Sequence, residues 1–177
     1  MKIVRRPAPG RVLVRRLWPI LILAGVFASA CRTPDPQKEI GLADLEAYWI
    51  VDVPEKGEQY IAPAVRFILR NKGEDVAHSL QAKATFRREG QEWGGDWRRV
   101  TATGGKALRP GEDAVVVLRS EARYHTPGTP ESMFSHAQFK DATVDVFLRL
   151  GSSPWTKFGE LTVERRIGSK TVAAEAR

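Results

Sequence analysis

The sequence has very little cysteine: Cys31 is the only thiol in 177 residues. A chain with one cysteine cannot form an internal disulfide, so packing alone must hold any domain that it makes outside the cytoplasm. Histidine is also scarce, with three residues, and no serine lies in a Gly-x-Ser-x-Gly elbow. Because a nucleophile needs a base within reach and a third group to orient that base, we expect no enzymatic activity.

A hydrophobic run long enough to span a membrane as a helix is also missing. The apolar segment 17–27 has eleven residues, well short of the about 20 that a transmembrane helix needs. It follows a positively charged region, residues 1–16, and this order is typical of a secretory signal peptide. The sequence therefore predicts a leader over residues 1–30 rather than a membrane helix.

Acidic residues are absent from this leader, and its basic residues explain most of the charge of the chain, +7. The six are Lys2, Arg5, Arg6, Arg11, Arg15 and Arg16. Removing these six from the 28 Lys and Arg leaves 22, against 21 Asp and Glu, so residues 31–177 carry only +1. A domain near neutrality lacks the clustered positive charge of a nucleic-acid-binding protein, and we expect no nucleic-acid partner.

The leader ends in three small residues, Ala28, Ser29 and Ala30, immediately before Cys31. This stretch resembles the lipobox of bacterial prolipoproteins, with Ala28 at the position where Leu is usual. Small side chains let the backbone enter a peptidase groove, and a thiol is nucleophilic enough to take a diacylglyceryl group as a thioether. The resemblance implies a chain cleaved before Cys31 and anchored by lipid on that residue. The alternative is an ordinary secretory signal that leaves Cys31 as a free thiol, or that is cleaved elsewhere.

The residue after the cysteine is Arg32, whereas Asp at this position resembles the inner-membrane retention signal of enteric lipoproteins. The resemblance therefore implies a lipoprotein of the outer membrane that faces the periplasm, held stably by two or more acyl chains. Pro34 and Pro36 predict an extended tether over residues 31–38. At the other end, residues 167–177 have few large apolar side chains and predict a flexible tail.

Between the tether and the tail, residues 39–166 alternate apolar and polar side chains with a period of two. Val65, Phe67 and Leu69 are expected on one face of a strand, with Arg66 and Arg70 on the other. Such alternation is typical of antiparallel strands with one face on a core and one in water. We expect seven strands, at residues 45–53, 65–71, 79–88, 92–100, 113–120, 142–150 and 160–166. The fold class predicted is an all-β sandwich.

One segment, residues 128–141, breaks the alternation. Thr129 can cap a helix, Pro130 suits its first position and Glu131 suits its positive end. The sequence predicts one short helix of two or three turns, with Met133 and Phe134 packed against an end of the sandwich.

The order of strands and turns resembles the immunoglobulin-like modules of bacterial lipoproteins and surface proteins, of the FxLYD and CARDB sort. Three stretches carry the resemblance: "PAVRFILRNKGEDVAHSLQAKATF", "LRPGEDAVVVL" and "FKDATVDVFLRL". It covers residues 45–166 and implies an immunoglobulin-like antiparallel fold with a binding or scaffolding role, without an enzymatic activity.

The stretch "EWGGDWRR" is the candidate recognition surface. Trp93 and Trp97, with two glycines between them, are expected on an edge strand with a bulge. There an exposed Trp with Arg98 and Arg99 could stack on a sugar or dock a protein partner of the cell envelope. The alternative is that the tryptophan rings turn inward as part of the core.

A metal site is the other functional reading. His125, Met133 and His136 lie within twelve residues, and thioether with imidazole suits Cu(I). After residue 31 the chain has a single Met, and with Cys31 taken by lipid it has no free Cys for a blue-copper site; both speak against a copper carrier, so we expect no metal and no cofactor. The function predicted is a non-catalytic binding or envelope-assembly role, with copper handling as the alternative.

Overall fold

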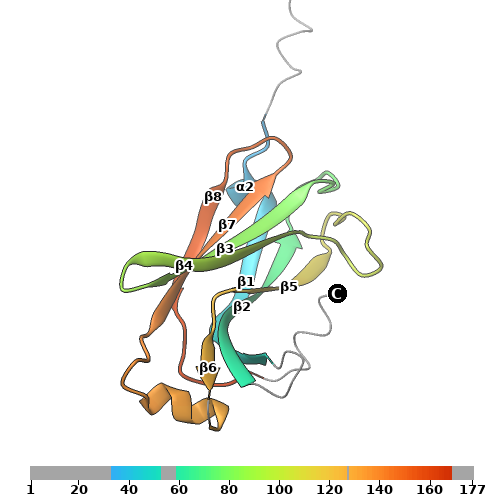
Figure 1. The fold of residues 1–177 in the computed structure, drawn as a ribbon. Helices are drawn as coiled ribbons and strands as arrows, with labels where there is room; N and C mark the ends of the chain where they lie inside the picture. Colours follow the sequence, from blue (N-terminus) through green and yellow to red (C-terminus); the bar gives the residue numbers. More distant parts are fainter. Residues whose placement is uncertain (1–32, 53–58, 127, 169–177) are drawn as a thin grey trace, which may run out of the picture. The chain divides into compact units, whose positions relative to one another are not determined.

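The computed structural model describes residues 33–52, 59–126 and 128–168, which form two antiparallel sheets packed face to face (Figure 1). The first sheet has the order β1-β2-β5, with β6 also paired to β2. Its strands are β1 Ile40–Asp52, β2 Gln59–Asn71, β5 Asp113–Arg119 and β6 Tyr124–Thr126. The second sheet has the order β4-β3-β7-β8. Its strands are β3 Leu80–Arg88, β4 Gln91–Arg99, β7 Ala142–Leu150 and β8 Thr156–Thr162.

This strand order confirms the predicted all-β sandwich. The connections from β2 to β3, from β4 to β5 and from β6 to β7 each cross between the sheets, as in immunoglobulin-like sandwiches. The predicted leader, including Cys31 and Arg32, and residues 169–177 lie outside the described residues. No helix in the described part of the chain has the length and apolar content needed to cross a bilayer.

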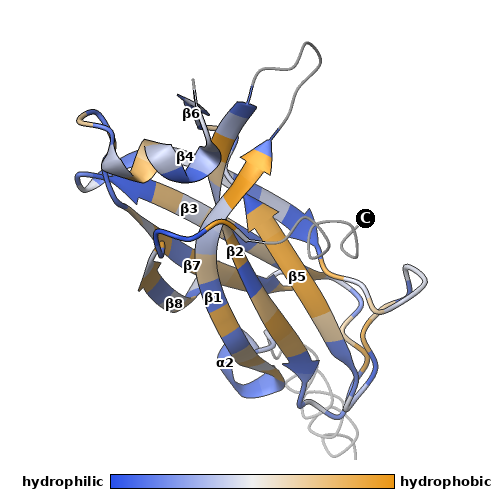
Figure 2. Ribbon diagram, turned by 90° about the horizontal axis from the view of Figure 1, so that it is seen from below, coloured by the Kyte–Doolittle hydropathy of each residue, from blue (hydrophilic) through white to orange (hydrophobic). Residues whose placement is uncertain are grey.

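The core lies between the two sheets and is built from the apolar positions that the alternation placed on one face. Phe67 and Leu69 of β2, Phe86 of β3 and Val146 of β7 are completely buried. β5 departs from this alternation, because Figure 2 shows its hydrophobic residues 114–118 as an almost continuous band. Residues 114, 116 and 118 are buried in this core, whereas Val115 points to the outer face and is exposed.

An aromatic cluster closes one end of the core. The ring of Trp49 lies 5.1 Å from that of Phe139, 5.8 Å from that of Tyr124 and 6.2 Å from those of Trp93 and Phe134. Aromatic pairs at such distances and tilted angles add to the stabilisation from burial.

The predicted helix is present with two turns, but it is wound more tightly than an α-helix. It is a 3₁₀ helix, η1, Pro130–Ser135, and Met133 is buried against the core. The Thr129 side chain makes no capping hydrogen bond, and after Ser135 the backbone turns extended at His136. The last turn is closed by a hydrogen bond from His136 N to the Met133 carbonyl, and the helix ends after six residues. Short runs are usual for 3₁₀ helices because their hydrogen bonds have poorer geometry than those of an α-helix.

The tether also differs from the expectation. Instead of staying extended to residue 38, the chain forms a one-turn helix, α2, Pro36–Glu39. Asp35 caps it by accepting a hydrogen bond from Gln37 N at 3.1 Å, and Pro36 occupies the first turn. The first residue of a helix has a backbone N–H without a partner in the helix, so the missing N–H of Pro36 costs nothing there. The residue that predicted an extended tether therefore starts a helix.

The C-terminal strand is divided between the two sheets. β8 ends at Thr162, and the chain then passes to the edge of β1, where Trp49 N donates to the Arg166 carbonyl and Gly168 N to the Trp49 carbonyl. The predicted strand 160–166 therefore pairs with β7 at its start and with β1 at its end. Ile167 and Gly168, placed by the sequence in the tail, belong to this second pairing.

Candidate binding surface

The structure separates the four residues of the predicted recognition surface. β4 is an edge strand, as expected, and its pairing with β3 places Asp96 opposite Ala84 and Arg98 opposite Ala82, on the side that faces the other sheet. Trp97 and Arg99, opposite Lys83 and Gln81, point to the outer face. A change of register between Phe86 and Arg87 leaves Trp93 as the extra residue of a bulge.

Trp93 turns inward and is structural. Its ring lies 5.0 Å from that of Tyr124 and joins the aromatic cluster at the end of the core. The next two residues must be glycines. A side chain at position 94 would collide with Ser120, and a Cβ at position 95 would approach the Ala84 carbonyl oxygen to 2.8 Å. The two glycines thus allow β4 to pass close to its neighbours, and Trp93, expected as an exposed partner contact, is partly buried against the core.

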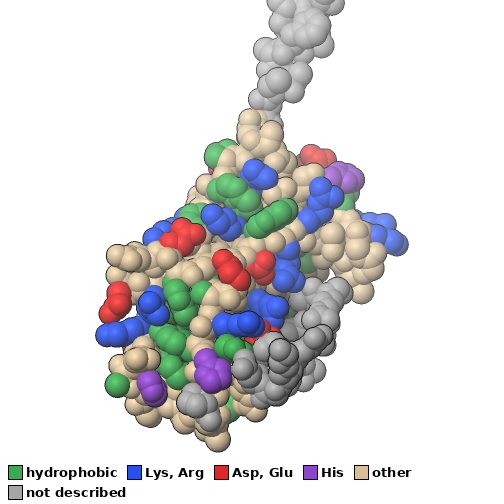
Figure 3. Space-filling view, in the orientation of Figure 1, with side chains coloured by type: hydrophobic (Ala, Val, Ile, Leu, Met, Phe, Trp, Pro, Cys, Tyr) green, Lys and Arg blue, Asp and Glu red, His purple; other side chains and the backbone are tan. Residues whose placement is uncertain are grey.

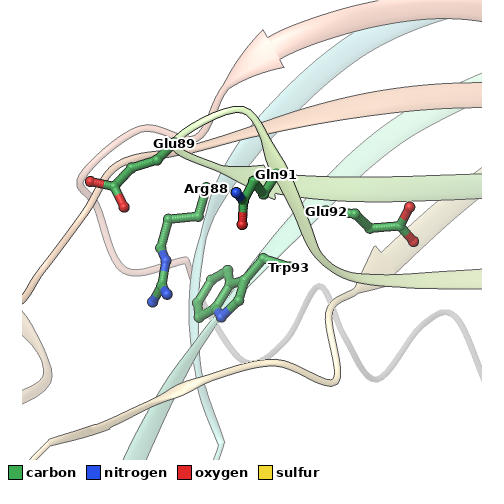
Figure 4. A pocket seen from close by; sticks show the side chains of 5 residues that line it. All are labelled: Arg88, Glu89, Gln91, Glu92 and Trp93. Carbon is green, nitrogen blue, oxygen red and sulfur yellow. The ribbon is translucent and has the colours of Figure 1, made fainter.

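A small pocket lies beside Trp93, at the hairpin that joins β3 to β4 (Figure 4). It has a volume of about 150 Å³ and is lined by Arg88, Glu89, Gln91, Glu92 and Trp93. The Arg88 guanidinium lies 5.3 Å from the Trp93 ring centroid and donates a 3.4 Å hydrogen bond to Tyr124 Oη. Its only cation is therefore already engaged with the aromatic cluster, and we regard the pocket as part of the framework.

Arg98 points into a groove between the ends of β4 and β5. The groove has a volume of about 630 Å³, and its lining also includes Ile68, Arg99, Asp113 and Val115. Arg98 Nη2 donates to Asp96 Oδ2 at 3.3 Å, and the same oxygen accepts from Arg119 N on β5. Asp96 thus connects the two sheet edges, and Arg98 supports this connection.

Trp97 is the side chain of the predicted set that is most open to solvent, with 63% of its surface exposed. It starts a row across the outer face of the second sheet, followed by Lys83 on β3, Phe147 on β7 and Lys157 on β8. The adjacent row contains Arg99, Gln81 and Arg149. We call the surface formed by Gln81, Lys83, Trp97, Arg99, Phe147, Arg149 and Trp155 the Trp97 face. Figure 3 shows the molecule from this side, with Lys and Arg side chains interleaved with hydrophobic ones and with several Asp and Glu.

Arg149 organises the part of the Trp97 face nearest the turn between β7 and β8. Its guanidinium lies 4.8 Å from the ring centroid of Trp155 and donates a 2.7 Å hydrogen bond to Gln81 Oε1. Arg149 Nε is buried without a hydrogen-bond partner. The Arg149 cation is thus held over the Trp155 ring, and its hydrogen-bond partner, Gln81, is neutral.

The cations of the outer face fall into two groups. In one, Asp145 accepts hydrogen bonds from Arg87 at 2.9 Å and Lys157 at 2.7 Å. Burial opposes ionisation of Asp145, but these two hydrogen bonds outweigh it and lower its pKa. In the other group, Lys83, Arg99 and Arg149 make no salt bridge with any described residue. The Trp97 face therefore carries three cations that no carboxylate of residues 33–52, 59–126 and 128–168 pairs with in a salt bridge.

The structure gives the copper alternative no support. Met133 is 6% exposed and packs in the core, while the His125 ring lies against that of Tyr60 at 5.2 Å. His136 Nδ1 accepts a hydrogen bond from Gln138 N. Among residues 33–52, 59–126 and 128–168, no group of three or more His, Cys, Asp and Glu side chains could hold a metal ion.

No family model matches this chain. No curated protein matches its sequence either. The chain is similar in structure to the X-ray structure of a Northeast Structural Genomics Consortium target, SoR45, at 9% identity and a TM-score of 0.42 over 73% of this chain and 89% of that one. It is also similar to a protein from Archaeoglobus fulgidus, at 13% identity and a TM-score of 0.37 over 70% and 98%.

The sequence missed five members of the Trp97 face: Gln81, Lys83, Phe147, Arg149 and Trp155. The signal for three of them was present, because the alternation already placed Gln81, Lys83 and Arg149 on polar faces of their strands. What was missing was the order β4-β3-β7, which brings residues more than fifty positions apart into adjacent rows.

Proposed function

We propose that this protein is a lipid-anchored lipoprotein of the cell envelope that works by binding a partner through the Trp97 face and has no catalytic role. The observation that carries the proposal is a largely exposed Trp97 beside three cations, Lys83, Arg99 and Arg149, none of which forms a salt bridge within the described residues. Exposed aromatic side chains and arginine are enriched where proteins meet partners. The resemblance to FxLYD and CARDB modules supports the same role.

The anchor is the first test of this proposal. Cells that express the wild-type chain and are fed a fatty-acid probe should label it, and the Cys31→Ser variant should show no label, because no other thiol exists to take the lipid. The wild-type protein should remain with membranes on fractionation, and the variant should be released. Equal labelling of the two chains would contradict the hypothesis that Cys31 carries the lipid.

Contact through the Trp97 face is tested by site-specific photo-crosslinking in cells. A photoreactive residue at position 97 should capture a partner that the same residue at position 115 does not. Val115 is the matched control, because it is also exposed on an outer sheet face but belongs to the opposite sheet. Identical patterns from both positions would contradict the choice of face.

The Trp97→Ala variant should lose the crosslinked partner or its phenotype without losing stability. Because Trp97 is exposed, we expect its free energy of unfolding to change by less than about 0.5 kcal/mol. Chemical denaturation of both chains measures this change. A large loss of stability would instead identify Trp97 as a packing residue and remove it from the site.

A further inference from the structure

We infer that the Trp97 face binds an acidic linear polysaccharide, with sugar rings stacked on the aromatic side chains and carboxylates paired with the unneutralised cations. This inference rests on the proposed function and names the class of ligand for that surface. It follows from the spacing of the rows, from the kinds of side chain in them and from the lack of a large apolar patch.

The spacing suits an extended chain. Trp97 and Phe147 lie in one row on strands separated by β3, so their backbones are about 10 Å apart. The row with Arg99, Gln81 and Arg149 lies two residues along the strands, about 7 Å away. Aromatic and cationic side chains thus occur in parallel rows on one sheet surface, where a linear polymer crossing the strands can meet both.

The chemistry of these side chains matches a uronate better than a neutral sugar. The apolar face of a pyranose ring stacks on an indole ring, and Trp97 offers one that is 63% exposed. Lys83 and Arg99 offer positive charge that forms no salt bridge with a described residue, and Arg149 adds a guanidinium that lies over Trp155 and is likewise not part of a salt bridge. Hydrogen bonds between a cation and a carboxylate are stronger than those between neutral groups, so a sugar ring with a carboxylate binds these cations more tightly than a neutral sugar ring does.

A protein or a membrane fits this surface less well. The core of a protein interface is apolar and well packed, but only four large hydrophobic side chains of the described residues are exposed. Of these, Trp97 and Trp155 belong to this face, and the Arg149 guanidinium lies over Trp155. A membrane-inserting surface needs a protruding apolar rim, whereas here one widely exposed ring stands among cations on a sheet.

Binding of defined polymers to the full chain in nonionic detergent tests the inference. The probe is polygalacturonate; dextran is the neutral polymer, poly-glutamate supplies carboxylates without sugar rings, and mixed micelles with phosphatidylglycerol supply an anionic lipid surface. We expect saturable binding to polygalacturonate, weaker at ~0.5 M salt because screening reduces ion pairing at an exposed surface. Dextran, poly-glutamate and the lipid should bind at least about tenfold more weakly, because each lacks either the ring or the charge in polymer form.

Variants assign this binding to the Trp97 face. Trp97→Ala and the double variant Lys83→Gln with Arg99→Gln should each weaken polygalacturonate binding about tenfold. Lys106→Gln and Val115→Ala are the matched controls, since they remove an exposed cation and an exposed apolar group that are not members of the Trp97 face, and they should change it less than about twofold.

The inference is overturned if dextran or poly-glutamate binds as tightly as polygalacturonate, if Trp97→Ala has no effect, or if the lipid is preferred. It is also overturned if no polymer binds. In that case a partner captured from position 97 in cells would leave the proposed function standing with another ligand, and no captured partner would remove both.

Discussion

Replacing Phe67 with aspartate should abolish the folded sandwich. Phe67 is completely buried in the middle of β2, where it faces the second sheet. The change removes a large aromatic side chain and places a carboxylate where no described cation can reach it without opening the core. Losing the aromatic ring alone costs about 3–5 kcal/mol, and burying an unpaired charge adds to this cost. The sum approaches the whole stability of a typical domain.

The neighbouring residue is the matched control. Ile68 is the next position on the same strand, but it points to the outer face and lies opposite Val115. Ile68→Asp introduces the same carboxylate between the outward-facing Arg66 and Arg70, so we expect a loss of less than about 1.5 kcal/mol. Near-ultraviolet circular dichroism and urea denaturation of the two variants measure the difference. A cooperatively folded Phe67→Asp chain would show that the two faces of β2 are assigned the wrong way round.

Loss of the Asp145 carboxylate should be the second-largest effect. Asp145 is 7% exposed and is the shared acceptor of Arg87 and Lys157. Asp145→Asn leaves these two cations facing each other around a weaker acceptor. Both cations can turn toward water, so we expect a loss of about 1–3 kcal/mol in the free energy of unfolding rather than complete unfolding. Asp141→Asn is the control, because its pair with Arg165 is about half exposed on both sides and should contribute less than about 1 kcal/mol.

The same carboxylate predicts how stability depends on pH. The pKa of Asp145 is lowered in the folded chain, since the hydrogen bonds from Lys157 and Arg87 outweigh the opposing effect of burial. A group with a lowered folded pKa stabilises the fold above its unfolded pKa, near pH 4, and this stabilisation is lost as the pH falls toward the folded value. The free energy of unfolding, measured by urea denaturation, should therefore fall more below about pH 4 for the wild type than for the Asp145→Asn variant. Parallel curves for the two chains would show that Asp145 contributes nothing through its charge.

Local patterns were sufficient for most of the fold. The alternation in residues 65–71, 79–88 and 142–150 assigned Phe67, Phe86 and Val146 to the core and Arg66, Lys83 and Arg149 to the outer faces, and the structure confirms each assignment. This succeeds because side chains alternate across a strand whatever its partner, so one buried face imposes the pattern on the sequence.

Elsewhere the local signals pointed the wrong way because distant partners decided the outcome. The predicted strand began at residue 65, because a proline at position 63 is unusual inside a strand. In the structure β2 begins at Gln59, and Pro63 lies opposite Trp49 in the pairing of β1 with β2. Residues 124–126 are too short to show alternation, but they pair with the start of β2. Residues 163–168 read as the end of one strand and the start of a tail, whereas their hydrogen bonds go to Ala142, Ala47 and Trp49.

The sequence by itself determined that the chain is an all-β sandwich, that its excess charge lies before residue 31, and which side of each alternating strand is polar. The tertiary structure decided which polar sides meet. A bulge of one residue turned Trp93 toward the core, where it is partly buried, and left Trp97 outside, although both had looked equivalent in the sequence. The order β4-β3-β7-β8 then placed Trp97 beside Lys83, Phe147 and Arg149. Register and strand order depend on contacts between distant segments, and a binding surface assembled across strands is therefore visible only once the sheet has formed.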